Sequence, residues 1–240
     1  ARFAELLAAY CLEAQSGETV LVEAETPALP LLSHLKRALL RRGAYPLIRL
    51  SYPGEERDFL LFGGRWLEEV PEAELALYQR ADKFLRVLSA ENPLEAAAVD
   101  PALALRRQRA WRLLQEIRLG KRWALTLCPT VGYAVGAGMG TEEFRAYLQR
   151  ALFLDREDPV AAWQELLAAE HTAVYGYAVV VGRLRAEGDP AADAAAAGLD
   201  EHRRRRDGAV ARLVLRHRLG GAELERQHAA FVVVVRDRGR

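Results

Sequence analysis

This sequence is short of lysine, of cysteine and of long apolar runs, and each shortage excludes a class of protein. Lysine occurs only at Lys36, Lys83 and Lys121, so arginine carries nearly all of the positive charge. Because 34 basic residues nearly balance 33 acidic ones, the net charge of +1 gives no overall field that would attract nucleic acid or an anionic membrane. No apolar run reaches the roughly 20 residues of a spanning helix, and no secretory signal begins the sequence. We expect neither a nucleic-acid partner nor a membrane partner.

The two cysteines, Cys11 and Cys128, are too far apart in sequence to have metal-ligand spacing. A reduced, cytoplasmic compartment fits two such thiols best. Cys128 ends a predicted strand, where it is either a nucleophile or, more commonly, a small buried apolar residue. Heavy use of arginine, alanine, glycine and leucine indicates a GC-rich genome and is compatible with a thermophile.

Apolar segments alternate with helical patterns over the first 169 residues. Runs of apolar and β-branched residues predict strands at 19–25, 45–52, 83–90 and 122–130. Apolar residues at helical spacing predict helices at 3–15, 31–40, 55–62, 72–80, 101–119, 141–153 and 158–169. Strands separated by helices form βαβ units, so we predict an α/β fold with a doubly wound, mainly parallel open sheet and helices on both faces.

The carboxyl ends of the predicted strands are where a ligand is expected, because open parallel sheets bind ligands there. Those ends bring Glu25, Tyr52, Glu91 and Thr130 toward one edge of the sheet. We therefore expect a cleft near these residues, without a motif that defines its chemistry.

The glycine-rich run VGYAVGAGMG, residues 131–140, lies between a predicted strand and a predicted helix. A turn of this kind can hold phosphate against backbone N–H groups. It matches neither the G-x-G-x-x-G pattern nor the G-x-x-x-x-G-K-[ST] pattern. A flexible or close-packed connection is therefore the preferred interpretation.

Histidine and carboxylate patterns give little support for a metal site. Glu225 and His228 have the Glu-x-x-His spacing of carboxylate-bridged metal helices, but that architecture needs a second such motif. A solvated helix face is the simpler interpretation. The other histidines have no such neighbour: His34, His171, His202 and His217. We assign no catalytic or metal-binding residue in this chain, and its ligand-binding residues stay undefined.

Two further features have a functional and a structural interpretation. The basic run HRRRR, residues 202–206, could contact nucleic acid or anionic lipid, but acidic residues surround it and it lacks the interleaved aromatics that stack bases. A solvated basic run is preferred. We expect packing roles for the four scattered tryptophans, Trp66, Trp111, Trp123 and Trp163.

The composition changes near Gly182. From Arg183 to Arg240 there are thirteen arginines, no lysine and nine acidic residues, so this segment carries a net charge of +4 and the rest carries −3. Strand periodicity is poor there, and an alanine run precedes the arginines. We expect an α/β domain over 1–170 and an irregular or helical Arg/Ala-rich tail over 171–240.

The segments RWALTLCPT, AGMGTEEFRAYLQRALFLD and EDPVAAWQEL resemble the end of the N-terminal domain in the thermophilic metalloaminopeptidase family of aminopeptidases T and S. The run from Asp158 to Trp163 is the most specific part. The resemblance covers residues 3–169 and agrees with the predicted βαβ pattern. On this interpretation Asp158 caps a helix, Pro159 begins it, and Trp163 packs it onto the sheet.

The resemblance implies a dimeric, cytoplasmic exopeptidase that removes N-terminal residues from peptides with two cocatalytic zinc or cobalt ions. It also implies that the metal ligands belong to a second domain, beyond the matching segment. We therefore expect no cofactor in this chain and no activity of this chain alone.

The tail does not continue the family pattern, which favours a truncated relative or a reading frame shifted after about residue 171. Two other functions stay open. One is a non-catalytic α/β module for binding or dimerisation, and the other is an unrelated small-molecule-binding protein that uses the glycine turn 132–140.

Overall fold

A computed structural model describes residues 1–166, 168, 193, 196, 197, 199, 210–212 and 232–236 of this protein. Its centre is a sheet with the strand order β2-β1-β3-β4-β6-β5. Four consecutive strands in this order are parallel, and their bounds are β1 (Thr19–Glu25), β2 (Tyr45–Ser51), β3 (Lys83–Leu88) and β4 (Arg122–Leu127). The predicted α/β class and mainly parallel sheet are confirmed, with strand ends that differ by at most three residues.

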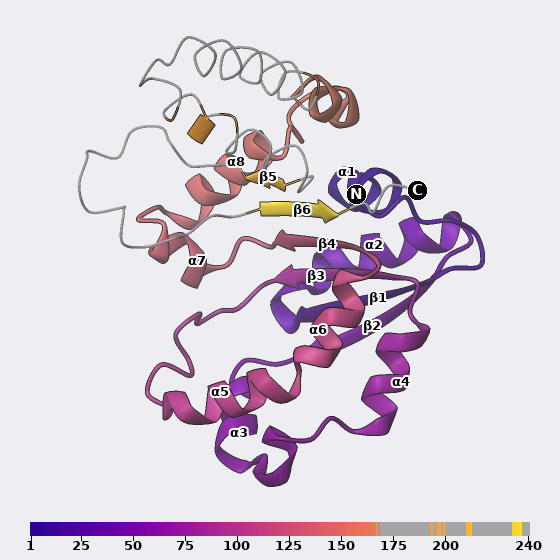
Figure 1. The fold of residues 1–240 in the computed structure, drawn as a ribbon. Helices are drawn as coiled ribbons and strands as arrows, with labels where there is room; N and C mark the ends of the chain where they lie inside the picture. The colour runs from indigo at the N-terminus through magenta and orange to yellow at the C-terminus, as the bar shows by residue number, and fades with distance from the viewer. Residues whose placement is uncertain are drawn as a thin grey trace.

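Helices connect the parallel strands (Figure 1). The predicted helices are present, although the first ends at Cys11 rather than at residue 15 and the helix Val131–Gly136 was not predicted. Their bounds are α1 (Arg2–Glu5), the π-helix η1 (Leu6–Cys11), the 3-10 helix η2 (Thr26–Ala28), α2 (Leu29–Arg41), α3 (Glu55–Phe62), the 3-10 helix η3 (Gly64–Leu67), α4 (Glu72–Arg80), α5 (Pro101–Ala110), α6 (Arg112–Leu119), α7 (Val131–Gly136) and α8 (Thr141–Ala151). A further helix occupies 159–166. The predicted helix 101–119 is in fact two helices, because Trp111 has φ −82° and ψ 0° and leaves helical geometry.

Each face of the sheet has its own apolar cluster. On one face Val22, Leu85 and Ala124 pack with residues of η1, α2 and the 159–166 helix. On the other face Leu21 and Phe84 pack with Tyr78 of α4 and Leu114 of α6. Alternate residues of each strand therefore enter opposite clusters, as expected for a sheet covered on both sides.

The segment 158–163 has the structural role predicted for it. Asp158 Oδ1 accepts hydrogen bonds from the backbone N–H groups of Val160 at 2.9 Å and Ala161 at 3.0 Å, so it caps the helix that follows. Trp163 is only 4% exposed and belongs to the same apolar cluster as Ala124 and Val87 of the sheet. Leu166 packs against this cluster, and Leu167, predicted to do the same, lies outside the described residues.

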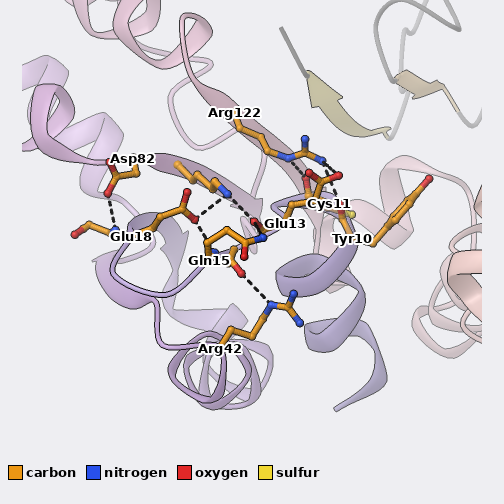
Figure 2. Close-up of polar contacts among 11 residues, drawn as sticks. Tyr10, Cys11, Glu13, Gln15, Glu18, Arg42, Asp82 and Arg122 are labelled. Carbon is orange, nitrogen blue, oxygen red and sulfur yellow. Dashed lines mark hydrogen bonds and ion pairs between the residues drawn. The ribbon is translucent and has the colours of Figure 1, made fainter. Parts of the chain in front are cut away.

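Cationic side chains hold the end of the first helix against the amino ends of the strands (Figure 2). Arg122 of β4 donates to the carbonyl oxygens of Cys11 at 3.0 Å and Tyr10 at 3.2 Å. Lys83 of β3 donates to the carbonyl oxygen of Glu13 at 2.6 Å. Positive charge at a helix carboxyl terminus is stabilising because the terminal carbonyls are otherwise unpaired.

The tail departs in part from the sequence-based expectation of irregular or helical structure, since its described residues 193, 196, 197 and 199 are helical. Two short strands lie in it, β5 (Val210–Arg212) and β6 (Val232–Arg236). β6 pairs antiparallel with β4 and with β5, and Figure 1 shows it running opposite to β4. The four consecutive valines of β6 explain the difference, since β-branched residues favour extended backbone. Among the described residues, none of the helices is long and apolar enough to cross a membrane.

Candidate functional site: a charged cleft at the carboxyl ends of the strands

Charged residues cross one face of the sheet in a row. Glu23 of β1 lies in register with Arg49 of β2 on one side and with Arg86 of β3 on the other. Two residues earlier, the same face carries Leu21, which packs in the cluster with Phe84. Strands of a covered parallel sheet are normally continuous apolar runs, so this charged row marks the place where packing gives way to a site.

A cleft of about 490 Å³ opens over this row. Its floor is formed by the carboxyl-terminal halves of β1, β2 and β3, and its walls by α3, α5 and α6. In Figure 1 α3 and α5 lie toward the arrowhead end of β2, and α6 lies across the middle of the strands. The volume is that of a site for a small molecule.

Two of the cleft arginines are held by neighbouring side chains. Arg49 forms an ion pair with Glu74 and lies 5.7 Å from the centroid of the Trp111 ring. Arg107 of α5 forms an ion pair with Glu56 of α3 and stacks 4.8 Å from the same ring. Both guanidinium groups therefore contact the Trp111 ring, which lies at the junction of α5 and α6.

Glu23 has a neutral hydrogen-bond donor as its partner. The Tyr78 hydroxyl donates to Glu23 Oε1 at 2.6 Å. Burial, and then the charge of Glu23, raise the pKa of Tyr78, so the phenol keeps its proton and remains a donor at neutral pH.

Arg86 and Arg118 both line the cleft, and Glu23 offsets part of their charge. Within the described part of the chain, neither side chain makes an ion pair or a hydrogen bond, and the Nε of Arg118 is buried without a partner. Burial, and then the positive charge of Arg86, lower the pKa of Arg118. Arg86 is exposed and Arg118 is half-buried, so both guanidinium groups can receive an anion from solvent.

The opposite end of the cleft is acidic. Burial, then Glu95, and more weakly Glu55 and Glu91, raise the pKa of Glu25, while Arg86 lowers it. Glu95 Oε2 accepts a hydrogen bond from the Gly54 N–H at 2.6 Å, so part of its charge is compensated. The cleft therefore has a cationic region near the middle of β3 and an anionic region at the ends of β1 and β2.

The prediction of which residues lie near the cleft is partly correct. Glu25 and Tyr52 line it, and the β3 end contributes Ala90 and Asn92 rather than Glu91. Thr130 is buried beside the cleft instead of lining it. Its hydroxyl donates to the Ala90 carbonyl oxygen at 2.6 Å and accepts from the Tyr133 N–H at 3.4 Å, so it serves as the N-cap of α7.

The glycine run is a close-packed connection. A Cβ atom on Gly132 would lie 2.1 Å from the carbonyl oxygen of Glu91 and 2.7 Å from Cδ of Pro93. Gly132 is therefore required for α7 to approach the 91–93 loop. This contact supports the structural interpretation of the run over phosphate binding.

Other candidate residues have structural or undescribed positions. Cys128 is half-buried, and burial raises the pKa of its thiol, which opposes a role as an activated nucleophile. His34 is exposed on α2. Trp111 and Trp123 pack in the cluster around Phe84, whereas Trp66 is 37% exposed. The remaining candidates lie outside the described residues: His171, His202, His217, Glu225, His228 and the run 203–206.

The described residues do not fit a metal centre. No group of three or more histidine, cysteine, aspartate or glutamate side chains among them is arranged to hold an ion. A two-metal centre requires a larger convergent set of carboxylate and imidazole ligands. No step of a metal-dependent reaction can be assigned to the described residues.

Sequence reasoning missed the charged row and Arg118. The sequence does contain a sign of this row, because each of three predicted buried strands includes a charged residue. These residues are Glu23, Arg49 and Arg86. Their alignment depends on strand register, which the sequence does not specify. Arg118 has no comparable signal, since a charge on a helix normally indicates its solvated face.

Fold and cleft together define a doubly wound α/β domain with a charged cleft at the carboxyl ends of its strands. A family model described as thermophilic metalloprotease (M29) matches residues 1–175, and the chain belongs to that family. A second model, described as a domain of unknown function (DUF4439), matches residues 162–237.

One solved structure similar to this chain is wild-type AmpT from Thermus thermophilus, with a TM-score of 0.58 and 21% sequence identity. The match covers 74% of this chain and 48% of that one, so this chain spans about half the length of that protein. Similarity at this identity shows a common fold. No curated protein is similar enough to this chain to count as a match.

Proposed function

We propose that residues 1–170 form the N-terminal α/β domain of a metal-dependent aminopeptidase that removes N-terminal residues from peptides. The observation that carries this proposal is the family match over residues 1–175. The fold shared with AmpT supports it. The resemblance to the metalloaminopeptidases supplies the reaction class, and two divalent metals, zinc or cobalt, are part of the proposal.

We further propose that the metal ligands lie outside the described residues, in a segment that the α/β domain needs for activity. The absence of a suitable ligand group among the described residues supports this division. On this proposal the α/β domain positions partners and small molecules, and the chemistry takes place elsewhere. The family match does not favour a purely non-catalytic module.

The experiment is a joint measurement of metal content and peptidase activity on the 240-residue chain. After dialysis against zinc or cobalt, we expect no stoichiometric metal and no hydrolysis of a leucyl reporter. Two tightly held metal ions per chain, with turnover abolished by a chelator and by His228→Ala, would place the catalytic site in the tail. The converse experiment joins the second half of a family member to this chain. The longer chain should bind metal and hydrolyse the leucyl reporter.

The tail needs a separate proposal. The DUF4439 model matches it in the present reading frame, and a shifted frame gives no reason for such a match. This counts against the frameshift prediction and favours a second segment joined to the α/β domain. The DNA downstream of codon 170 decides between them: a second frame that encodes the glutamate and histidine ligands would support the frameshift.

Assembly and location complete the proposal. The resemblance favours a homodimer in the cytoplasm, acting on peptides. Sedimentation equilibrium of the 240-residue chain tests the assembly, and a monomer at micromolar concentration would contradict the dimer for this chain.

A further inference from the structure

We propose that the cleft binds a small zwitterion of the α-amino acid type, with its carboxylate between Arg86 and Arg118 and its ammonium group at Glu25. The inference stands on the geometry of the described residues and does not depend on the peptidase proposal. It assigns a binding site to the α/β domain itself.

The charges that would meet the ligand lie on one face of the sheet at a suitable separation. Glu25 lies two residues beyond Glu23 on β1, so both point to the same face, and Arg86 is opposite Glu23 on β3. A rise of about 3.3 Å per residue and a strand spacing of about 4.8 Å put the Cα atoms of Glu25 and Arg86 about 8 Å apart. No ion pair joins their side chains, although both line the cleft. An amino acid head group fits between two such side chains.

The cationic end is only partly balanced by a carboxylate of the chain. Arg49 and Arg107 are paired with Glu74 and Glu56, but Arg86 and Arg118 have no such partner among the described residues. Glu23 offsets part of their charge, and its carboxylate already accepts the Tyr78 hydroxyl at 2.6 Å. A ligand carboxylate can accept several hydrogen bonds from two guanidinium groups at once.

The anionic end selects against a purely anionic ligand. Glu25, Glu55 and Glu95 line the same cleft, and Glu91 lies close enough to act on Glu25. A phosphate or a nucleotide would be repelled by these carboxylates, whereas an ammonium group would relieve their mutual repulsion. The two ends together match a zwitterion.

The rest of the cleft leaves room for a side chain. The head group of an amino acid occupies only part of a cleft of about 490 Å³. Ala96, Ala104 and Trp111 contribute apolar surface to the lining. Both ends of the ligand would be bound by charge, and its side chain would lie against this apolar part.

The experiment is calorimetric titration of the 240-residue chain with L-leucine and two analogues that each lack one charge. L-leucinol lacks the carboxylate, N-acetyl-L-leucine lacks the ammonium group, and a peptidase can cleave neither leucine nor leucinol. We expect leucine to bind and each analogue to bind at least about tenfold more weakly, as expected for loss of a charged hydrogen-bonding group. Failure of millimolar leucine to bind would overturn the proposal, as would equal binding of N-acetyl-leucine or inorganic phosphate, which would indicate an anion site.

Variants assign the two ends separately. Arg86→Gln and Arg118→Gln should weaken leucine about tenfold and leave leucinol unchanged, and Glu25→Gln should weaken leucinol and leave N-acetyl-leucine unchanged. Arg109→Gln is the matched control, because Arg109 is exposed on α5 and does not line the cleft. If leucine affinity survives all three cleft substitutions, the binding site is elsewhere. The analogue series uses the unmodified chain, so it decides the question even if a variant does not fold.

Discussion

The ring of Trp163 meets the ring of Phe153 edge to face, with centroids 5.2 Å apart. This contact joins the 159–166 helix to the turn after α8, and both rings pack against the cluster beneath the sheet. Trp163→Ala should therefore lower the free energy of unfolding by about 3–5 kcal/mol, through lost burial and an unfilled cavity. Chemical denaturation measures this change.

Trp66→Ala is the matched control for that substitution. Trp66 is 37% exposed, and its ring carries only the Arg65 guanidinium, 4.4 Å from the centroid. Its loss should cost less than about 1 kcal/mol. Equal losses for the two tryptophans would show that Trp163 does not hold the helix to the sheet.

Replacing Lys83 should also lower the free energy of unfolding, because its side chain contacts residues outside its own strand. Its ammonium group donates to the Glu13 carbonyl at 2.6 Å and lies 2.8 Å from Glu18 Oε2, while the residue is only 9% exposed. Lys83→Met leaves the part-buried Glu13 carbonyl and the half-buried Glu18 carboxylate without their cation, so we expect a loss of about 1.5–3 kcal/mol in unfolding free energy. Lys36→Met, at an exposed position of α2, should change it by less than about 0.5 kcal/mol. Similar values for the two lysines would contradict a role for Lys83 in holding the first helix.

The parallel strands could be predicted because their apolar runs are local and are bounded by turn residues. The same holds for the Asp158 cap, whose chemistry needs only the next three residues. The alignment of Glu23 with Arg49 and Arg86 could not be predicted, since it depends on register between strands far apart in sequence. The break at Trp111 was also missed, because the helical pattern of the sequence continues through it. Long-range contacts, rather than local propensity, therefore create the site.

The two thiols should differ in reactivity. Cys11 is 2% exposed, and burial raises the pKa of its thiol to about 12. Iodoacetamide at pH 8 should leave Cys11 unlabelled in the native protein and label half-buried Cys128 slowly, because only the thiolate reacts. Both should react at the same rate in denaturant. Mass spectrometry of the labelled peptides measures this, and rapid native labelling of Cys11 would show that the first helix opens readily.

The same pKa predicts an alkaline loss of stability. The unfolded thiol ionises near its usual value of 9.0, whereas the folded thiol stays protonated until about 12. Over this interval the unfolded state releases its proton first, so the free energy of unfolding falls as pH rises. Cys11→Ala should remove this part of the decline. An identical alkaline decline in the variant would assign it to other groups.

Glu25 should decrease stability at neutral pH. Burial and Glu95 raise the pKa of Glu25, so its folded carboxylate is disfavoured relative to the unfolded one. Glu25→Gln should raise the melting temperature at pH 7, and the gain should shrink in acid, where the wild-type carboxyl group is protonated and neutral. Glu143→Gln, exposed on α8, should show neither effect. A lower melting temperature for Glu25→Gln at pH 7 would mean that the carboxylate is stabilised by its surroundings.

The glycine run provides the sharpest paired test, because two of its glycines lie in opposite surroundings. A Cβ on Gly132 would lie 2.1 Å from the Glu91 carbonyl oxygen, whereas one on Gly136 meets nothing within 4 Å. Gly132→Ala should destabilise the fold by about 1–3 kcal/mol through overpacking. Gly136→Ala should be neutral or stabilise it by up to about 1 kcal/mol.

The effect of Gly132→Ala should extend to the cleft. The 91–93 loop that it displaces carries Asn92 and Pro93, which line the cleft, so leucine affinity should fall together with stability. Gly136→Ala should leave leucine affinity unchanged. Thermal melting and leucine titration of both variants measure the two effects. A phosphate-binding turn would behave differently, because its phosphate affinity would fall and its leucine affinity would not. If Gly132→Ala keeps full stability and full leucine affinity, the close approach of α7 to the 91–93 loop does not shape the cleft.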